Sequence, residues 1–119
     1  SVACLELNLS VLLAETPRVA TAKPVSRFPR SDFDLAFTAP NALTAGVLMK
    51  ALRQAGAAEL VDIELFDVYR GAGLPEDSRS LTFRLCLQAS DRTLNDSEVT
   101  SIRQKCLDAA EKLGAHLRN

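Results

Sequence analysis

The chain has 119 residues, nearly half of them hydrophobic, with 14 basic and 15 acidic side chains. A domain of this size buries enough apolar surface to fold without disulfides or metal ions. The formal net charge of −1 excludes a protein that holds nucleic acid mainly through bulk positive charge. The cysteines Cys4, Cys86 and Cys106 and the single histidine, His116, are far apart in the sequence. This usage indicates reduced thiols in a cytosolic protein rather than a disulfide framework, a zinc site or an iron–sulfur site.

The sequence predicts neither a membrane span nor a signal peptide. Its apolar runs are shorter than a membrane span, and its first residues do not have the pattern of a signal peptide. The first residue is Ser1 rather than Met, and we expect an excised part of a longer protein. One histidine near the end gives no Ser/His/Asp or Cys/His constellation, so we predict neither catalytic residues nor a metal site.

The first residues form an arm ahead of the main domain. Residues 3–9 alternate between apolar and polar side chains, which predicts a half-buried strand, and Ser10 is expected to cap a short helical turn. Three prolines interrupt residues 16–29, which have no periodicity and indicate a linker. We expect the arm to fold back on the domain or to pair with another copy. We place the boundary near Pro24, which gives an arm of residues 1–25 and a domain of residues 26–119.

Within that domain, alternating side chains predict three strands, and the last residues leave room for a short fourth one. Apolar stripes at helical spacing predict two helices, the first ending at Gly56 and the second ending at Gly114. Asn95 and Glu98 are spaced as a capping box at the start of the second helix. The predicted strands are residues 33–38, 60–69, 80–88 and 116–118, and the predicted helices are residues 44–55 and 96–113.

This order of elements predicts an α+β fold of the ferredoxin-like split βαβ type, βαββαβ, with an antiparallel sheet and both helices on one face. The other side of such a sheet, here called the open face, is left uncovered and can bind a ligand. Fold alone does not identify that ligand. The side chains expected on the open face are Asp34, Thr82, Arg84 and Gln88.

Several short motifs give the sequence a family resemblance. The motifs are Ser26-Arg27-Phe28-Pro29, Asp34-Leu35-Ala36, Phe66-Asp67-Val68-Tyr69-Arg70-Gly71, Arg79-Ser80-Leu81, Arg84-Leu85, Arg92-Thr93-Leu94 and Leu117-Arg118. Taken in order, they resemble the C-terminal ferredoxin-fold anticodon-binding domain of bacterial phenylalanyl-tRNA synthetase β chains over residues 26–119. The preceding apolar segment of the arm looks like the end of the catalytic-like domain of that β chain, which lacks an active site.

The resemblance implies a part of a cytoplasmic aminoacyl-tRNA synthetase. Such an enzyme is an α2β2 heterotetramer that joins phenylalanine to tRNA-Phe with ATP and Mg²⁺, and its catalytic residues lie in the α subunit. The β-chain domain contacts the anticodon stem-loop, so this chain is expected to bind RNA and to hold no catalytic residue, cofactor or metal. The residues that we expect to contact RNA are Arg84, Tyr69, Arg70, Asp34, Ser80, Thr82 and Arg79.

One position departs from the family pattern. An Arg usually precedes the Asp of the first strand, whereas Phe33 stands there in this chain. If that Arg contacts RNA, its absence moves the expected contacts toward Arg84, Tyr69 and Arg70.

Each proposed contact also has an ordinary structural explanation. Asp34 and Arg84 can form a cross-strand ion pair that only stabilises the sheet. Phe66 is expected in the core, and Tyr69 either packs or stacks on a base. The loop at residues 70–75 lacks phosphate-loop spacing and is interpreted as a hairpin turn. Surface arginines are often simply solvated, and this applies to Arg79, Arg92 and Arg118.

Two other functions fit a ferredoxin-like fold. An acylphosphatase-like hydrolase needs a phosphate-binding loop after the first strand, with an Arg and an Asn. Residues 39–42 supply Asn41 but no Arg and no glycine-rich loop, which argues against it. A stand-alone ligand-sensing or protein-docking domain remains an open alternative.

Overall fold

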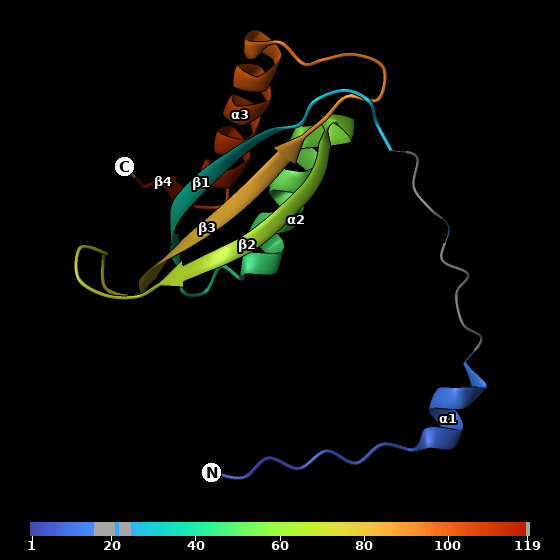
Figure 1. The fold of residues 1–119 in the computed structure, drawn as a ribbon. Coiled ribbons are helices and arrows are strands. Elements are labelled where there is room, and N and C mark those ends of the chain that lie inside the picture. The colour runs from blue at the N-terminus through green and yellow to red at the C-terminus, as the bar shows by residue number, and fades with distance from the viewer. Residues whose placement is uncertain (16–20, 22–24, 119) are drawn as a thin grey trace.

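The structure is a computed structural model that describes residues 1–15, residue 21 and residues 25–118. After the N-terminal arm, a strand and a helix are followed by a β-hairpin, a second long helix and a short final strand (Figure 1). The elements are α1 (Leu9–Ala14), β1 (Ser31–Pro40), α2 (Ala45–Gly56), the single 3-10 turn η1 (Ala57–Glu59), β2 (Leu60–Tyr69), β3 (Ser78–Leu87), α3 (Asp96–Glu111) and β4 (His116–Leu117).

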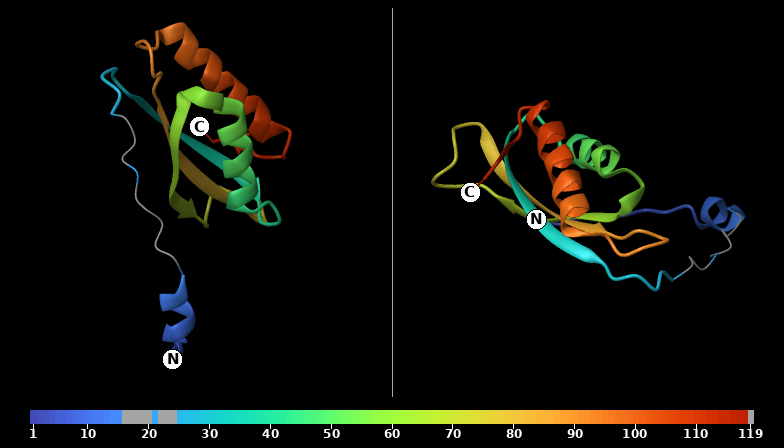
Figure 2. Two further views of the ribbon diagram at one scale, coloured as in Figure 1. Left: turned by 90° about the vertical axis from the view of Figure 1, so that its right-hand side faces the viewer. Right: turned by 90° about the horizontal axis from the view of Figure 1, so that it is seen from above.

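The four strands form one antiparallel sheet in the order β2-β3-β1-β4. Both α2 and α3 lie against the same side of this sheet, and no helix among the described residues covers the opposite side (Figure 2). This arrangement confirms the predicted α+β ferredoxin-like fold.

The core lies between the sheet and the two helices. Alternate residues of β1 and β3 point into it, and Phe37 and Phe83 are fully buried with ring centroids 6.4 Å apart. Leu48 and Leu52 from α2 and Cys106 from α3 close the core from the helical side. The opposite strand residues are thereby turned toward the open face.

Local sequence signals set the helix ends. The Thr44 side chain accepts a hydrogen bond from the Val47 N–H at the start of α2, and Asn95 and Glu98 form the predicted capping box. Gly114 has φ +76°, the left-handed conformation that favours glycine after α3. Gly56, the last residue of α2, has φ −75° and is needed for a different reason: a Cβ there would lie 2.5 Å from the Leu60 Cβ, and only glycine lets the end of α2 lie this close to the start of β2.

Two bulges in β2 correct the predicted side-chain alternation of this strand. Its register with β3 shifts between Leu60 and Asp62 and again between Leu65 and Asp67, so each shift inserts one extra residue. A regular strand would place Phe66 and Tyr69 on opposite faces. Because Phe66 is the inserted residue of the second bulge, both aromatic side chains are available to the open face.

The arm differs from its prediction. Residues 1–8 form no strand, and the helix α1 is capped by Asn8, whose side-chain oxygen accepts from the N–H groups of Ser10 and Val11. A strand needs a neighbouring strand to satisfy its backbone groups. The sheet of the described residues consists of the strands β1, β2, β3 and β4 and includes no strand from the arm. No residue of α1 is buried, so the described residues of the arm do not fold back on the domain, and the alternative, pairing with another copy, stays a prediction.

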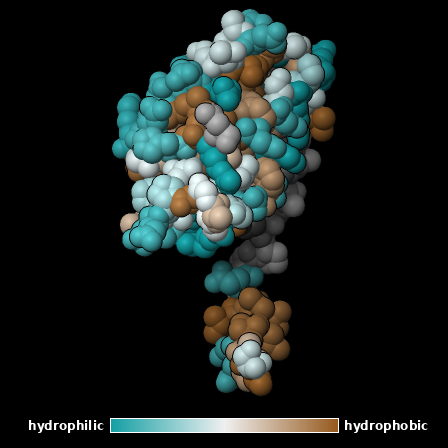
Figure 3. Space-filling model, turned by 90° about the vertical axis from the view of Figure 1, so that its left-hand side faces the viewer, coloured by the Kyte–Doolittle hydropathy of each residue, from teal (hydrophilic) through white to brown (hydrophobic). Residues whose placement is uncertain are grey.

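Residues 1–15 of the arm form a mainly hydrophobic body that lies below the domain in Figure 3. The predicted boundary at Pro24, most of the predicted linker and the last residue, Asn119, lie outside the described residues. Within the described part of the chain, no helix combines the length and the apolar character that crossing a membrane requires.

Candidate nucleic-acid interface

The open face consists of rows of polar side chains that run across β1, β3 and β2. Direct cross-strand neighbours include Thr38, Ser80 and Tyr69 in one row, and Asp34, Arg84 and Glu64 in another. Between these rows lie three further open-face residues at registered positions, Ala36, Thr82 and Asp67.

Arg84 is held by two neighbours at the centre of the open face. Its Nε and Nη2 donate to Oδ1 and Oδ2 of Asp34, both at 2.9 Å, in a bidentate ion pair. Its Cζ also lies 4.9 Å from the centroid of the Phe66 ring. The hydrogen bond and charge of Arg84 lower the pKa of Asp34, and those of Asp34 raise the pKa of Arg84. The guanidinium is thus fixed along one edge and against one aromatic ring.

Tyr69 forms a second aromatic–arginine contact on the open face. The Cζ of Arg118 lies 5.1 Å from its ring centroid, and its hydroxyl donates to the Ala72 carbonyl at 3.3 Å. Gly71 makes room for this ring, because a Cβ there would lie 2.7 Å from the Tyr69 hydroxyl oxygen. Ser80, between Thr38 and Tyr69 in the register, is buried on this same face.

The loop after β1 gathers two arginines around Asn41, and we call Asn41, Arg70 and Arg79 the Asn41 rim. Arg70 Nη1 donates to Asn41 Oδ1 at 2.7 Å. Arg79 is buried and donates to the backbone carbonyls of Asn41 at 2.9 Å and Leu43 at 2.7 Å. The rim therefore presents carbonyl acceptors to the arginines rather than the N–H donors that cradle a phosphate. This arrangement gives no support to the acylphosphatase-like alternative.

The other end of the open face is acidic. Asp32 and Asp62 flank Cys86 in the register, and Glu64 follows on β2. Burial raises the pKa of the Cys86 thiol to about 11, with a further contribution from Asp32. Burial alone raises the pKa of Cys106 to about 11. Both thiols are protonated at neutral pH, which makes them poor nucleophiles and poor metal ligands.

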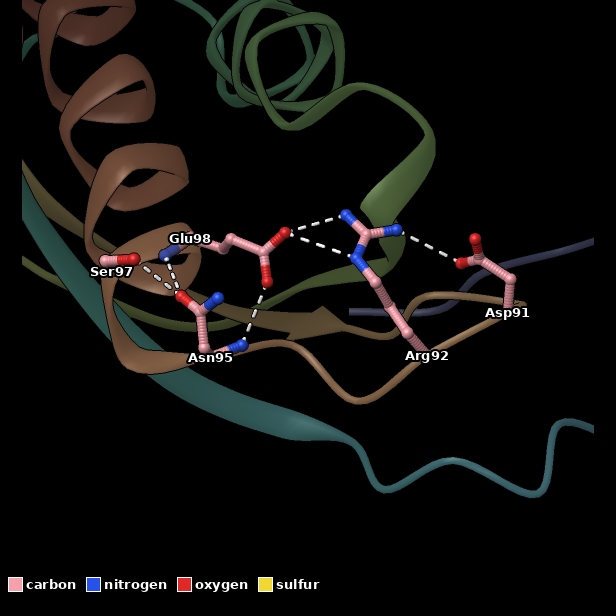
Figure 4. Close-up of polar contacts among 5 residues, drawn as sticks. All are labelled: Asp91, Arg92, Asn95, Ser97 and Glu98. Carbon is pink, nitrogen blue, oxygen red and sulfur yellow. Dashed lines mark hydrogen bonds and ion pairs between the residues drawn. The ribbon is translucent and has the colours of Figure 1, made fainter.

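Arg92 forms ion pairs next to the start of α3, away from the open face (Figure 4). It donates to Glu98 Oε1 at 2.7 Å and to Asp91 Oδ1 at 3.1 Å, while Glu98 Oε2 accepts from the Asn95 N–H. The Asn95 N–H lowers the pKa of Glu98 most, followed by Arg92. Arg92 also lines two hollows of about 330 and 250 Å³. Its observed contacts are structural.

The predicted site residues fall into two groups. The open face brings together Asp34, Arg84, Thr82, Ser80 and Tyr69, whereas Arg70 and Arg79 belong to the Asn41 rim. Gln88 lies past β3 and donates to the Phe28 carbonyl.

Sequence reasoning missed Phe66, which is 48% exposed rather than buried in the core as predicted. It also missed Asp67, which the second bulge places beside Thr82. Alternation alone cannot reveal an inserted residue, so the only signal was an aromatic residue three positions before the end of the strand.

Phe33 lies opposite Leu85 and packs against the core rather than on the open face. The departure from the family pattern at this position therefore leaves the open face unchanged. Among the described residues, no group of three or more His, Cys, Asp or Glu side chains could hold a metal ion.

Together, the fold and the open face define an α+β domain with an uncovered antiparallel sheet that offers two aromatic–arginine contacts. The sequence model of the ferredoxin-fold anticodon binding domain matches residues 26–118, and the chain belongs to this family. That match begins where Ser26 Oγ and Gln88 Nε2 donate to the carbonyls of Ala89 and Phe28, contacts that join the first matched residues to the end of β3.

Curated relatives agree with this assignment. The chain is 44% identical over 124 residues to "Phenylalanine--tRNA ligase beta subunit" of Trichormus variabilis, covering 100% of the chain and 15% of the relative. It is 44% identical over 121 residues to the protein of that name from Thermosynechococcus vestitus, covering 96% and 15%. For the Idiomarina loihiensis protein of that name, identity is 43% over 115 residues, covering 96% and 14%. The chain thus spans about one seventh of the length of these relatives.

Proposed function

We propose that this chain is the anticodon-binding domain of a phenylalanine–tRNA ligase β subunit and that its open face binds the anticodon stem-loop of tRNA-Phe. The observation that supports this most is the open face itself, where two exposed aromatic side chains each contact an arginine. Aromatic rings and guanidinium planes are the surfaces on which proteins stack the unpaired bases of RNA loops.

The charge distribution supports one orientation of the RNA. Asp32 and Asp62 lie at one end of the open face, with Glu64 between them and the centre, and Arg118 and the Asn41 rim lie toward the other end. Phosphates are repelled by the first end and attracted by the second. The sugar–phosphate backbone of the loop therefore runs along the Arg118 and Arg70 side, with its bases turned toward the sheet.

The predicted contact residues then take different roles. Tyr69 stacks on an unpaired base, and Thr82 donates or accepts hydrogen bonds at base edges, whereas Ser80 is buried between Thr38 and Tyr69 and makes no direct contact with the RNA. Arg70 contacts phosphate from the Asn41 rim, where Arg79 shapes the loop that positions it. Asp34 orients Arg84.

The remainder of the proposal concerns the longer protein. The arm of residues 1–25 is the end of a preceding catalytic-like domain, whose surface covers the apolar side chains of α1. The β subunit assembles with an α subunit in a cytoplasmic α2β2 heterotetramer. ATP with Mg²⁺ activates phenylalanine there, at residues outside this chain, while residues 26–119 select the tRNA.

A titration across a salt series tests the binding proposal. The 119-residue chain is mixed with the anticodon stem-loop of tRNA-Phe and with a stem-loop of altered anticodon. We expect tighter binding of the first, and a shallow salt dependence of about −0.7 in log K per log salt for each phosphate contacted. Tyr69→Ala should weaken binding about 5- to 100-fold through lost stacking. Equal and negligible binding of both RNAs would contradict the proposal.

A further inference from the structure

Arg84 is positioned on two sides, and this arrangement suggests a more specific role than that of a phosphate contact. Asp34 occupies its Nε and Nη2, and the Phe66 ring lies under its Cζ at 4.9 Å. Despite these contacts the Arg84 side chain is 54% exposed. The guanidinium is therefore held in one orientation while much of its surface faces solvent.

We infer that Arg84 binds an unpaired base of the RNA loop by stacking through the plane of its guanidinium, with Asp34 and Phe66 as its positioning residues. This inference rests on the proposed RNA-binding function and specifies how one part of the open face recognises its ligand. The order of the stack is the Phe66 ring, then the Arg84 guanidinium, then the base.

The charge around Arg84 favours a base over a phosphate. The Asp34 carboxylate neutralises the guanidinium at 2.9 Å, and Glu64 lies directly across from Arg84 on β2. A phosphate at this position would face two carboxylates with one cation between them. A base is uncharged, and a guanidinium already paired along its edge still offers a flat surface for stacking.

The second bulge of β2 makes this arrangement possible. Phe66 is the inserted residue between Leu65 and Asp67, so its ring reaches Arg84 instead of entering the core. The ring is 48% exposed and lies against one side of the guanidinium, with its centroid 4.9 Å from the Arg84 Cζ. Bulges often redirect a side chain at a functional position in this way.

Lys and Gln substitutions separate the stacking role from its alternatives. Arg84→Lys keeps the charge but removes the plane, whereas Arg84→Gln removes the charge. We expect Arg84→Lys to weaken binding of the anticodon stem-loop about 5- to 10-fold without changing the salt slope. We also expect that removing the base at one loop position weakens binding to the parent chain but not to the Arg84→Lys chain.

Phe66 variants test the positioning role. Phe66→Leu should weaken binding as Arg84→Lys does, and removing the base at the same loop position should then have no further effect. Phe66→Tyr should bind like the parent chain, because it keeps an aromatic ring under the guanidinium. Arg103→Lys on the exposed side of α3 serves as a matched control and should leave binding unchanged. Arg84 and Phe66 are half exposed, and thermal unfolding verifies that each variant is folded.

The outcomes distinguish this inference from the function on which it rests. If Arg84→Lys binds like the parent chain while Arg84→Gln weakens binding and lowers the salt slope, Arg84 contacts a phosphate and the stacking inference is wrong. If the parent chain binds and neither variant differs from it, the ion pair is purely structural and the inference is also wrong. If the parent chain binds no stem-loop at all, the proposed function fails together with the inference.

Discussion

Apolar side chains are more frequent in the arm than in the domain, yet those that the structure describes in the arm are exposed. In the arm, Leu5 is 82% and Leu13 is 80% exposed, whereas Leu35 and Leu81 in the domain are each 1% exposed. The helix α1 has four Leu or Val side chains among its six residues and buries none of them, whereas α2 has only three among twelve and buries Leu48 and Leu52. An apolar pattern therefore indicates that a segment is stabilised by burial, but the residues that bury it must come from other parts of the chain or from another surface.

The largest expected difference between the two regions is in core energetics. Phe83→Ala should lower the free energy of unfolding by about 3–5 kcal/mol, because it empties a fully buried site beside Phe37. Leu12→Ala in the arm should change it by less than about 0.5 kcal/mol. Urea unfolding followed by circular dichroism measures both values. A loss at Leu12 comparable to that at Phe83 would mean that the arm packs on the domain in solution.

Thiol reactivity gives a second contrast. At about pH 7.5, a maleimide should label the exposed Cys4 first, because a pKa near 11 leaves Cys86 and Cys106 with roughly a hundredfold less thiolate than an ordinary cysteine. A raised pKa lowers the thiolate fraction, and therefore the labelling rate, at every pH below that pKa. Mass spectrometry of timed samples identifies the labelled cysteines. Equal labelling of all three in the folded chain would contradict the burial of the other two, and urea should remove the difference.

The smallest expected effect is at the helix caps. Asn95→Ala removes the cap of α3 and should lower the free energy of unfolding by about 1 kcal/mol. Asn8→Ala removes the equivalent cap of α1 and should leave that free energy unchanged, because α1 is not coupled to the core. The same urea experiment measures both changes. An effect of Asn8 as large as that of Asn95 would show that the two regions unfold as one unit.

The sequence predicted most of the domain, because its local signals agree with its tertiary contacts. The capping box at Asn95, the left-handed Gly114 and the alternation of β3 each depend on near neighbours in the chain. The same local reasoning failed for residues 3–9. Their alternation has the period of a strand, but a strand also requires a neighbouring strand to pair with, and the alternation does not show whether one is present.

The open face was predicted less completely than the fold. The pairing of Asp34 with Arg84 follows from register between regular strands, and it was anticipated. The exposure of Phe66 follows from an inserted residue in β2, which leaves no mark in the alternation. The burial of Arg79 depends on carbonyls of Asn41 and Leu43, 38 and 36 residues away, which local patterns do not bring together.

The proposed function requires that RNA binds the open face of the domain and neither the helical face nor the arm. A nuclear magnetic resonance titration of the isotopically labelled chain with the tRNA-Phe anticodon stem-loop tests it most directly. We predict that the largest shifts fall on the Tyr69 ring, on the side-chain N–H groups of Arg84 and Arg118, and on the amides of β1 and β3, with α1 and the exposed side of α3 unchanged. Shifts concentrated on α2, α3 or the arm, with the open-face signals unmoved, would contradict the account.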